Sequence, residues 1–518
     1  MSMGVLRRES AATRRLGAAV ARALYRRDAR GRGGSRQGYA SGGVAVRGPE
    51  RGRPATIRRW PRRVVCSPQR GLSRSPDPAD YTDRLSACGS DVLMSPNETT
   101  EPAGNGLRVV ILNQYYVPDV ASTGHLLHEL AEELVTHGVG VSVNTSRPSY
   151  GPPETWQPCP RREFTNGVDV TRMITTRFSK DHLLGRVLNS MTFLAPLMLR
   201  MLFRSRKGEV FLYTTNPPYL GVIGAFVSFL RPHPYVVLLH DSYPHLAVWV
   251  GKIRAGGLIE RVWHRLNRLI YRRAQQSIVL CEAAKELVCE DYGIAPELVH
   301  VIPNWADGRK LHPIPKAESE TARNHGLIEP FTVLYSGNLG LYYEFETILA
   351  AAEQLREANF RLVLIGAGGK RDWIARQIRE RELTNTLLLP YQPFRRLNDS
   401  LNACDASLVT IAKGIEGISY PSKLYSSLAV GRPILALSER GSELHRVVED
   451  HKVGHWFELG DADGVAACIR RMIDDPGQCA ELGRSARGLF EDRYTLGSSA
   501  ELYAQVLRMA SPRTGSSS

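Results

Sequence analysis

The sequence predicts an α/β protein with two Rossmann-like domains, preceded by a disordered extension. Short continuous apolar runs typical of buried parallel strands alternate with segments of helical periodicity between residues 107 and 510. This alternation stops at a polar stretch, 308–326, and then starts again. Glycine turns follow several of the strands, as they do in α/β folds that bind phosphate groups.

Residues 1–106 form the predicted extension. They contain 20 arginines, no lysine and 9 acidic residues, so +11 of the chain's net charge of +15 lies there. A low content of aromatic residues and many Ser, Gly and Pro predict disorder. Three explanations remain open: sequence translated upstream of the true start, a transit peptide, or a polyanion-binding tail. The lack of lysine favours the first, so we assign the extension no function and expect no nucleic-acid partner.

The cysteines and the apolar runs indicate the compartment. None of the eight cysteines forms a C-x-x-C pair, which favours a reducing cytoplasm. No apolar run reaches the roughly 18 residues of a membrane-spanning helix. The closest lies in residues 187–207, which are apolar with basic flanks. This stretch is either a peripheral contact with the inner face of the cell membrane or an amphipathic helix packed on its own domain.

The first predicted domain covers 107–307 and the linker covers 308–326. Its strands are expected at Arg108–Asn113, Val141–Asn144, Glu209–Tyr213, Tyr235–His240, Ser277–Leu280 and Val299–Pro303, with helices at Leu126–Leu134 and Leu258–Ala274.

Polar residues follow two of these strands. Gly124, in Ser122-Thr-Gly124, opens a helix whose amide groups can receive an anion. His240 and Asp241 lie together where another strand ends, and ligands of open parallel sheets bind beyond that end. This titratable pair is therefore the catalytic candidate.

The second predicted domain covers 327–510, and a frayed tail, 511–518, follows it. Its strands are expected at Thr332–Ser336, Arg361–Ile365, Thr386–Pro390, Ala406–Ile411, Pro433–Leu437 and Gly454–Phe457. The first strand ends in Gly337-Asn338 and the second in Gly366. Strand, glycine turn and helix together predict that this domain holds a nucleotide diphosphate.

Ordered landmarks across 107–510 resemble the retaining nucleotide-sugar glycosyltransferases of family four. The landmarks are Asn113-Gln-Tyr-Tyr-Val-Pro118 with Ser122-Thr-Gly124, His240-Asp-Ser-Tyr-Pro-His-Leu-Ala-Val248, Val301-Ile-Pro-Asn-Trp-Ala-Asp307, Tyr335-Ser-Gly-Asn-Leu339, Leu364-Ile-Gly-Ala-Gly368, Pro421-Ser-Lys-Leu-Tyr425 and Ala429-Val-Gly-Arg-Pro433. Within that family, the chain is most similar to bacterial transferases of capsule, colanic-acid and O-antigen assembly.

The resemblance implies the GT-B architecture, in which the two domains face each other across a cleft. It implies transfer of a hexosyl or aminodeoxyhexosyl group, with retention, from a nucleotide sugar to a lipid-linked glycan acceptor. Neither a metal nor a cofactor is expected. Tyr391 and Gln392 resemble the loop that reads the base, and His240 would lie near the reacting sugar. Asp461 and Asp463 form the only D-x-D, which we interpret as a helix cap. Glu443, in Gly441-Ser-Glu-Leu444, could cap its helix or reach the donor, and we prefer the cap.

The chain departs from the family pattern at the diphosphate. Asn338 and Tyr343 stand where many members have basic residues, and Ser426 stands where the ribose-binding glutamate is usual. The family's other glutamate has no clean match here, although Glu416 lies nearby. Because cations strengthen hydrogen bonds to phosphate, another cation should compensate, and Lys423, after Ser422, is the first candidate ahead of Lys413 and Arg432.

Two other functions stay open from the sequence. A nucleotide-sugar 2-epimerase has the same architecture, although the segments on the acceptor side fit transfer better. A non-catalytic scaffold that binds nucleotide sugars would explain the missing cations and glutamate.

Overall fold

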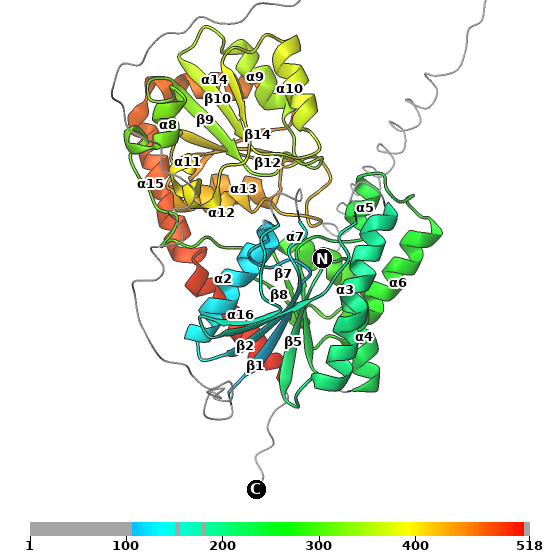
Figure 1. The fold of residues 1–518 in the computed structure, drawn as a ribbon. Coiled ribbons are helices and arrows are strands. Elements are labelled where there is room, and N and C mark those ends of the chain that lie inside the picture. Colours follow the sequence, from blue (N-terminus) through cyan, green and yellow to red (C-terminus); the bar gives the residue numbers. More distant parts are fainter. Residues whose placement is uncertain (1–105, 120, 151–155, 179–182, 232, 512–518) are drawn as a thin grey trace, which may run out of the picture. The chain divides into compact units, whose positions relative to one another are not determined.

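The computed structural model describes residues 106–119, 121–150, 156–178, 183–231 and 233–511. All of the predicted extension except Gly106 lies outside these residues, as do residues 512–518 of the tail. The described chain forms two separate sheets, each covered by helices (Figure 1). The predicted α/β fold with two Rossmann-like domains is therefore confirmed.

The first sheet has eight strands in the order β3-β4-β2-β1-β5-β6-β7-β8. All neighbouring strands pair in parallel except β3 and β4, which pair antiparallel. The strands are β1 (Arg108–Leu112), β2 (Gly140–Ser146), β3 (Arg162–Thr165), β4 (Val168–Met173), β5 (Glu209–Thr214), β6 (Tyr235–Leu239), β7 (Gln276–Val279) and β8 (Val299–Val301).

Helices cover both faces of this sheet, because alternate strand residues point to opposite faces. Val109 and Ile111 of β1 join one apolar core, while Val110 and Leu112 join the other. The helices are α2 (Ser122–Thr136), α3 (Leu183–Arg204), α4 (Leu220–Leu230), α5 (His245–Trp249), α6 (Leu258–Arg273), α7 (Glu282–Tyr292) and the 3-10 turn η3 (Pro296–Leu298).

Strand β3 and strand β4 form a hairpin that the sequence prediction missed. The two residues between them, Asn166 and Gly167, have φ angles of 50° and 81°. Two positive φ angles suit the right-handed twist of a hairpin, and Asn-Gly is the pair that adopts them most easily. The Asn-Gly pair that signals this turn is present in the sequence. The prediction considered only parallel strand–helix–strand units, which contain no such hairpin.

The second sheet has six strands in the order β11-β10-β9-β12-β13-β14, all paired in parallel. The strands are β9 (Phe331–Ser336), β10 (Phe360–Ile365), β11 (Thr386–Leu389), β12 (Ala406–Thr410), β13 (Ile434–Ser438) and β14 (Gly454–Glu458). The helical segments are η4 (Lys316–Glu318), α8 (Glu320–Asn324), α9 (Glu346–Gln354), α10 (Arg371–Glu380), η5 (Phe394–Arg396), α11 (Leu397–Leu401), α12 (Lys423–Ala429), α13 (Glu443–Asp450), α14 (Ala462–Asp474), α15 (Pro476–Arg493) and α16 (Leu496–Ala510).

The last helix, α16, packs against the first sheet. Its buried residues Ala500, Tyr503 and Leu507 belong to the same apolar core as α2. The preceding helix α15 packs in the core of the second sheet instead. The end of the chain therefore returns to the first sheet, while the predicted domain boundaries stay a prediction.

Residues 187–207 fall largely in α3. Phe193, Leu197 and Met201 are buried in the core of the first domain, whereas Met191 and Phe203 are exposed. The helix therefore packs on its own domain through one face and leaves another apolar face uncovered. Within the described residues, no helix combines the length and apolar character needed to cross a membrane.

Candidate active site

Two glycine turns meet at the carboxyl edge of the second sheet. Gly337 follows β9 and Gly366 follows β10, with φ angles of 140° and 149°. A Cβ atom on Gly366 would overlap the carbonyl group of Gly337, and one on Gly368 would overlap that of Leu339. These φ angles and the close backbone approach both require glycine. The two predicted turns therefore lie against each other.

Lys423 lies directly beside these turns. A Cβ atom on Gly337 would overlap the Cε atom of Lys423. The Nζ atom lies 4.0 Å from the ring centroid of Tyr343 and 5.1 Å from that of Tyr335. Burial lowers the pKa of Lys423 to about 7, because desolvation disfavours the charged form. An amine that can carry a positive charge is thus held next to the Gly337 turn.

Of the two residues that replace the basic residues of the family pattern, Tyr343 contacts this lysine, and Asn338 follows Gly337 in the adjacent turn. The ring of Tyr343 offers its face to the ammonium group, and such a contact is favourable when it is desolvated. The hydroxyl of Tyr335 donates to the carbonyl oxygen of Asn338 (2.6 Å). The tyrosine at 343 therefore supports the cation of another residue, a pairing that the sequence does not reveal.

The base-reading loop that the sequence suggested lies beside the second glycine turn. The hydroxyl of Tyr391 donates to the carbonyl oxygen of Ala367, 3.5 Å away, and half of the Tyr391 side chain is exposed. The amide of Gln392 donates to the carbonyl oxygen of Pro390 (3.1 Å). The role of both residues in base recognition stays a prediction.

The remaining predicted sugar-donor residues make local contacts. The carboxylate of Glu416 accepts a hydrogen bond from the Glu443 amide (2.6 Å), and burial raises its pKa. The Ser426 hydroxyl donates to the carbonyl oxygen of Lys423 (3.0 Å) within α12. Ser422 stands at the N-cap of α12 without a side-chain capping bond. Their roles in binding a sugar nucleotide stay predictions.

Of two helix N-termini, one is capped by the residue that the sequence predicted and the other is capped by a different residue. Asp461 caps α14 by accepting from the Gly464 amide (2.9 Å), as expected for the D-x-D sequence. Glu443 was expected to cap its own helix, but Ser442 caps α13 instead. The Glu443 carboxylate accepts from the Glu282 amide (3.1 Å), at the start of α7 in the first domain. That partner is too far away in sequence to be predicted.

His240 and Asp241 follow β6 at the carboxyl edge of the first sheet. The amides of both residues lie 3.3 Å from the hydroxyl oxygen of Thr215. Both ring nitrogens of His240 are buried without a hydrogen-bond partner among the described residues. Burial lowers the pKa of His240 to about 4, so its ring is neutral near pH 7. Burial raises the pKa of Asp241, and a hydrogen bond with Ser419 opposes that shift.

Asp241 also interacts with the second domain. Its charge contributes to the raised pKa values of Tyr342 and Tyr343, although burial is the main cause for both tyrosines. The amide of Ser242 donates to the carbonyl oxygen of Ile418 (2.7 Å). The catalytic candidate of the first domain and the tyrosines around Lys423 are therefore close enough to interact.

Gly124 lies in the first turn of α2. A Cβ atom on it would lie 3.1 Å from the carbonyl oxygen of Tyr115 and from the backbone of Tyr116. The glycine therefore lets α2 approach its own loop, a packing reason that the sequence does not reveal. Its expected role near a ligand stays a prediction.

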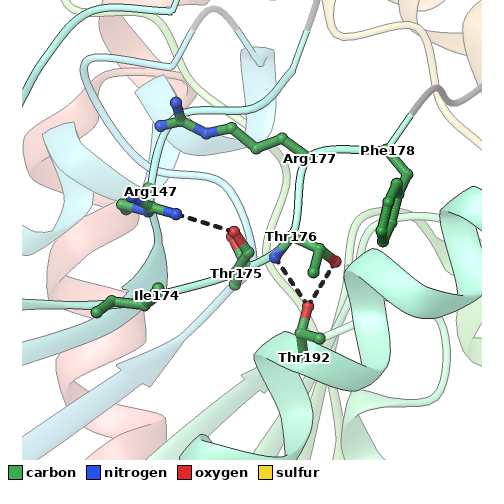
Figure 2. Close-up of a pocket in the computed structure, with 7 residues that line it drawn as sticks. All are labelled: Arg147, Ile174, Thr175, Thr176, Arg177, Phe178 and Thr192. Carbon is green, nitrogen blue, oxygen red and sulfur yellow. Dashed lines mark hydrogen bonds between the residues drawn. The ribbon is translucent and has the colours of Figure 1, made fainter.

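A separate pocket of about 470 Å³ lies beyond β2 and β4 (Figure 2). Arg147 donates to the carbonyl oxygen of Thr175 (3.1 Å), and the amide of Thr176 donates to the hydroxyl of Thr192 (3.1 Å). The Arg147 Nε atom and the Thr175 hydroxyl are buried without a hydrogen-bond partner among the described residues. Arg177 completes the basic lining, so the pocket can receive an anionic group.

One group of possible metal ligands occurs in the described part of the chain. It contains His245, His264 and Asp291, whose ligand atoms lie within 4.8 Å of one another. The Nε2 atom of His245 lies 2.7 Å from Asp291, and its Nδ1 atom lies 2.9 Å from the hydroxyl of Ser242. Hydrogen bonds thus already satisfy both nitrogens of His245.

Two protein families match the two domains. Residues 123–305 match the glycosyl transferase 4-like domain, and residues 318–489 match glycosyl transferases group 1. The chain is 25% identical over 403 residues to the Pseudomonas aeruginosa protein named "Probable glycosyltransferase WbjE", covering 77% of this chain and 98% of that one. It is 31% identical over 185 residues to the Escherichia coli protein named "Putative colanic acid biosynthesis glycosyl transferase WcaI", covering 35% of this chain and 45% of that one.

A solved structure shares the fold. The structure of HepE from Anabaena in complex with UDP and glucose matches with a TM-score of 0.60 and 18% identity, covering 78% of this chain and 99% of that one. The order of the two matched domains agrees with the order of the two sheets. The chain belongs to the family-four glycosyltransferases of the GT-B type.

Proposed function

We propose that the protein transfers a hexosyl or aminodeoxyhexosyl group, with retention, from a nucleoside diphosphate sugar to a lipid-linked glycan acceptor. The product would be a cell-surface polysaccharide of the capsule or O-antigen class. The likeness to WcaI, named for colanic acid biosynthesis, supports the polysaccharide assignment. The likeness to HepE, solved with UDP and glucose, supports a sugar nucleotide as the donor.

The observation that carries the proposal is the position of Lys423 beside the Gly337 turn. When the glycosidic C–O bond breaks, negative charge develops on the departing diphosphate. An ammonium group held in a desolvated site stabilises that charge more strongly than one in water. Lys423 then takes over the role of the basic residues that Asn338 and Tyr343 replace. With this cation in place, the reaction needs no metal ion and no cofactor.

His240 supports the sugar-binding part of the proposal. A buried polar atom without a partner is costly, and both ring nitrogens of His240 lack one among the described residues. The neutral ring offers one N–H group and one lone pair, which suit the hydroxyl groups of a sugar. Asp241 would orient His240 or the acceptor hydroxyl.

In the proposed reaction, the acceptor hydroxyl forms a new bond to the anomeric carbon on the face that the diphosphate leaves. The hydroxyl proton passes to an oxygen of the departing diphosphate, so charges and atoms balance. Lys423 holds the leaving group, and the first domain positions the acceptor.

The acceptor side offers two supporting features. The pocket that contains Arg147 and Arg177 suits an anionic group of the acceptor, such as its phosphate (Figure 2). The exposed apolar side chains of α3, within 187–207, suit the inner face of the membrane that holds a lipid-linked acceptor.

The test is transfer of labelled sugar. The protein is incubated with labelled UDP-, GDP- and dTDP-sugars and a lipid extract that contains lipid-linked glycans, with and without EDTA. We expect label to appear in the lipid fraction at equal rates with and without EDTA. A changed sugar without acceptor would mean an epimerase, and binding without chemistry would mean a scaffold. Loss of transfer in EDTA would refute metal independence.

A further inference from the structure

The first domain has an unusual apolar surface on one side. Helices α3, α4 and α6 lie side by side over one face of the first sheet (Figure 1). Each of them also exposes large apolar side chains on its outer surface. These side chains are Val187, Leu188, Met191, Leu199 and Phe203 of α3, Phe226, Phe229 and Leu230 of α4, and Leu258, Ile259, Val262, Leu266 and Leu269 of α6. Because large apolar residues occur here in a group, this surface suits a partner rather than water.

Helix α6 has two exposed stripes. Leu258, Val262, Leu266 and Leu269 recur at helical spacing and form an apolar stripe, with Leu258 76% exposed. A second stripe contains Arg261, Arg265, Arg268 and Arg272, which are all exposed, and its first three members directly precede Val262, Leu266 and Leu269. Glu260 is the only acidic residue of this helix. An apolar stripe beside a basic stripe is typical of helices that lie in the interface of an anionic membrane.

The apolar stripe borders a groove between α4 and α6. The groove has a volume of about 380 Å³. Tyr219 and Val222 line one wall, and Ile259, Val262 and Leu266 belong to the other. Tyr219 follows the loop after β5, and α6 begins after the segment that follows β6, so the groove lies toward the carboxyl edge of the sheet. His240 lies at the same edge.

We propose that the outer surface of α3, α4 and α6 docks on an anionic lipid bilayer, with α6 as the main contact. The apolar stripe enters the boundary between headgroups and acyl chains, and the arginine stripe binds the phosphate groups. The groove then opens near the bilayer, so that a lipid-linked acceptor reaches His240 over a short path. This inference extends the proposed function, but vesicle binding itself does not depend on sugar transfer.

Charge favours a bilayer over a second copy of this chain. In a symmetric contact through the same surface, the arginine stripe would meet another arginine stripe, and like charges repel. An anionic bilayer instead neutralises each arginine. The contact should therefore weaken as salt increases, although the apolar part of the contact remains.

The test is flotation of the full-length protein with vesicles, made of phosphatidylglycerol and phosphatidylethanolamine or of phosphatidylcholine alone. We expect binding to the anionic vesicles that falls with added NaCl and little binding to phosphatidylcholine. The double variant Val262→Glu/Leu266→Glu should bind about 100-fold more weakly, because two exposed apolar contacts are lost. The variant Arg265→Gln/Arg272→Gln should lose about fivefold in affinity for each arginine.

Met509→Glu is the matched control, since Met509 is 55% exposed on α16, which packs on the other face of the sheet. It should bind vesicles like the parent protein. All variants should keep the parent's affinity for UDP, which separates this inference from a failure of the proposed reaction. Vesicle binding by Val262→Glu/Leu266→Glu equal to the parent would overturn the inference. The inference would also be overturned if the parent protein formed a dimer that Val262→Glu/Leu266→Glu dissociates and if the parent did not bind anionic vesicles.

Discussion

Burial of the charged Lys423 side chain destabilises the free protein, and the same side chain is the main source of positive charge in the candidate site. Its pKa is lowered to about 7 by burial, so close to half of the molecules carry the charge near neutral pH. A bound diphosphate supplies the opposite charge and should raise that pKa again. Binding of the nucleotide above pH 7 is then coupled to uptake of a proton.

We therefore expect the affinity for UDP to fall as the pH rises above 7, by up to tenfold per pH unit. Calorimetry in buffers with different ionisation enthalpies measures the proton uptake directly. Lys423→Ala should weaken binding by about 10- to 100-fold, since hydrogen bonds to charged groups contribute about 1.5–3 kcal/mol. It should also remove the pH dependence in this range. Unchanged affinity in this variant would remove the basis of the proposed function.

Lys423→Met tests whether burial of the charged lysine destabilises the folded protein. In the unfolded chain the lysine keeps its ordinary pKa of about 10.4, so below pH 7 folding transfers a charge into a desolvated site. Methionine has a similar length and no charge. We expect the free variant to melt at a higher temperature than the parent at pH 6, with a smaller difference at pH 10. The same variant should bind UDP as weakly as Lys423→Ala. Equal melting temperatures at pH 6 would mean that the ammonium group is well solvated.

His240 should act on the sugar and not on the nucleotide. Its pKa near 4 keeps the ring neutral throughout the physiological range, so it works through hydrogen bonds rather than charge. His240→Ala should lower kcat by about 10²–10³, the effect of removing one preorganised hydrogen-bonding group, with UDP affinity nearly unchanged. His240→Gln, which retains an N–H group and an acceptor oxygen, should recover part of the rate. Initial-rate kinetics with saturating sugar donor measure both variants. A UDP affinity that falls in parallel with kcat would instead indicate damage to the fold.

At the level of single residues, the sequence allows a prediction where a short segment determines the local structure. The turns at Gly337 and Gly366 were predicted because each glycine directly follows an apolar run that is typical of a strand. Lys423 was chosen as a cation near a helix start, and it lies beside Gly337; its role in binding a diphosphate stays a prediction. The support from Tyr343 and the contact of Glu443 with Glu282 were not predicted, because each joins residues that only the tertiary fold brings together.

At the scale of an element, the two glycine turns act as one unit. A side chain at Gly366 would overlap the carbonyl group of Gly337, and its φ angle of 149° also excludes most residues. We expect Gly366→Ala to destabilise the second domain by more than about 2 kcal/mol, because strain and overlap add. Its UDP affinity should fall as well. Thermal unfolding with and without UDP measures both effects.

Gly441→Ala is the matched control for the turn. Gly441 also has a positive φ angle, 77°, but no atom lies within 4 Å of the position of its Cβ atom. Only the backbone strain of about 1 kcal/mol should appear in this variant, and UDP binding should remain. If the two variants lose equal stability and both keep UDP binding, contact between the turns is not what the glycines preserve.

Most strands of the two sheets were predictable because apolar runs of four to six residues followed by turn residues leave little choice of structure. The β3–β4 hairpin was not predicted, since both of its strands have mixed polarity; β3 is the edge strand, and β4 lies between β3 and β2. The position of α16 also depends on the tertiary fold. This helix packs against α2 in the core of the first sheet, a contact between segments that lie far apart in the sequence.

At the scale of the whole described chain, few polar contacts join the two sheet domains, and several lie close to the site. The indole N–H group of Trp249 donates to the carbonyl oxygen of Lys413 (3.0 Å), and the Ser242 amide donates to that of Ile418 (2.7 Å). The bond from the Glu282 amide to Glu443 is the one among these three that involves a titratable side chain. Glu443 can therefore make the contact between the domains sensitive to pH.

Burial raises the pKa of Glu443 to about 7; the Glu282 amide and Arg446 oppose this shift, whereas the charges of Glu416 and Glu282 add to it. The unfolded carboxyl group has a pKa of about 4.3, so between pH 4.3 and 7 the folded protein binds more protons than the unfolded chain. The free energy of unfolding that Glu443 contributes must then fall as the pH rises through this window, and it stays low above pH 7. Glu443→Gln stays neutral at every pH and keeps an oxygen that can accept from the Glu282 amide. We expect it to match the parent at pH 4 and to be more stable by about 1–3 kcal/mol at pH 8, measured by urea unfolding at both pH values.

The exposed Glu501→Gln on α16 serves as the control and should follow the parent throughout. A stability gain of Glu443→Gln that is the same at pH 4 and pH 8 would show that the Glu443 carboxyl does not titrate in this window, and the contact between the domains would then be insensitive to pH.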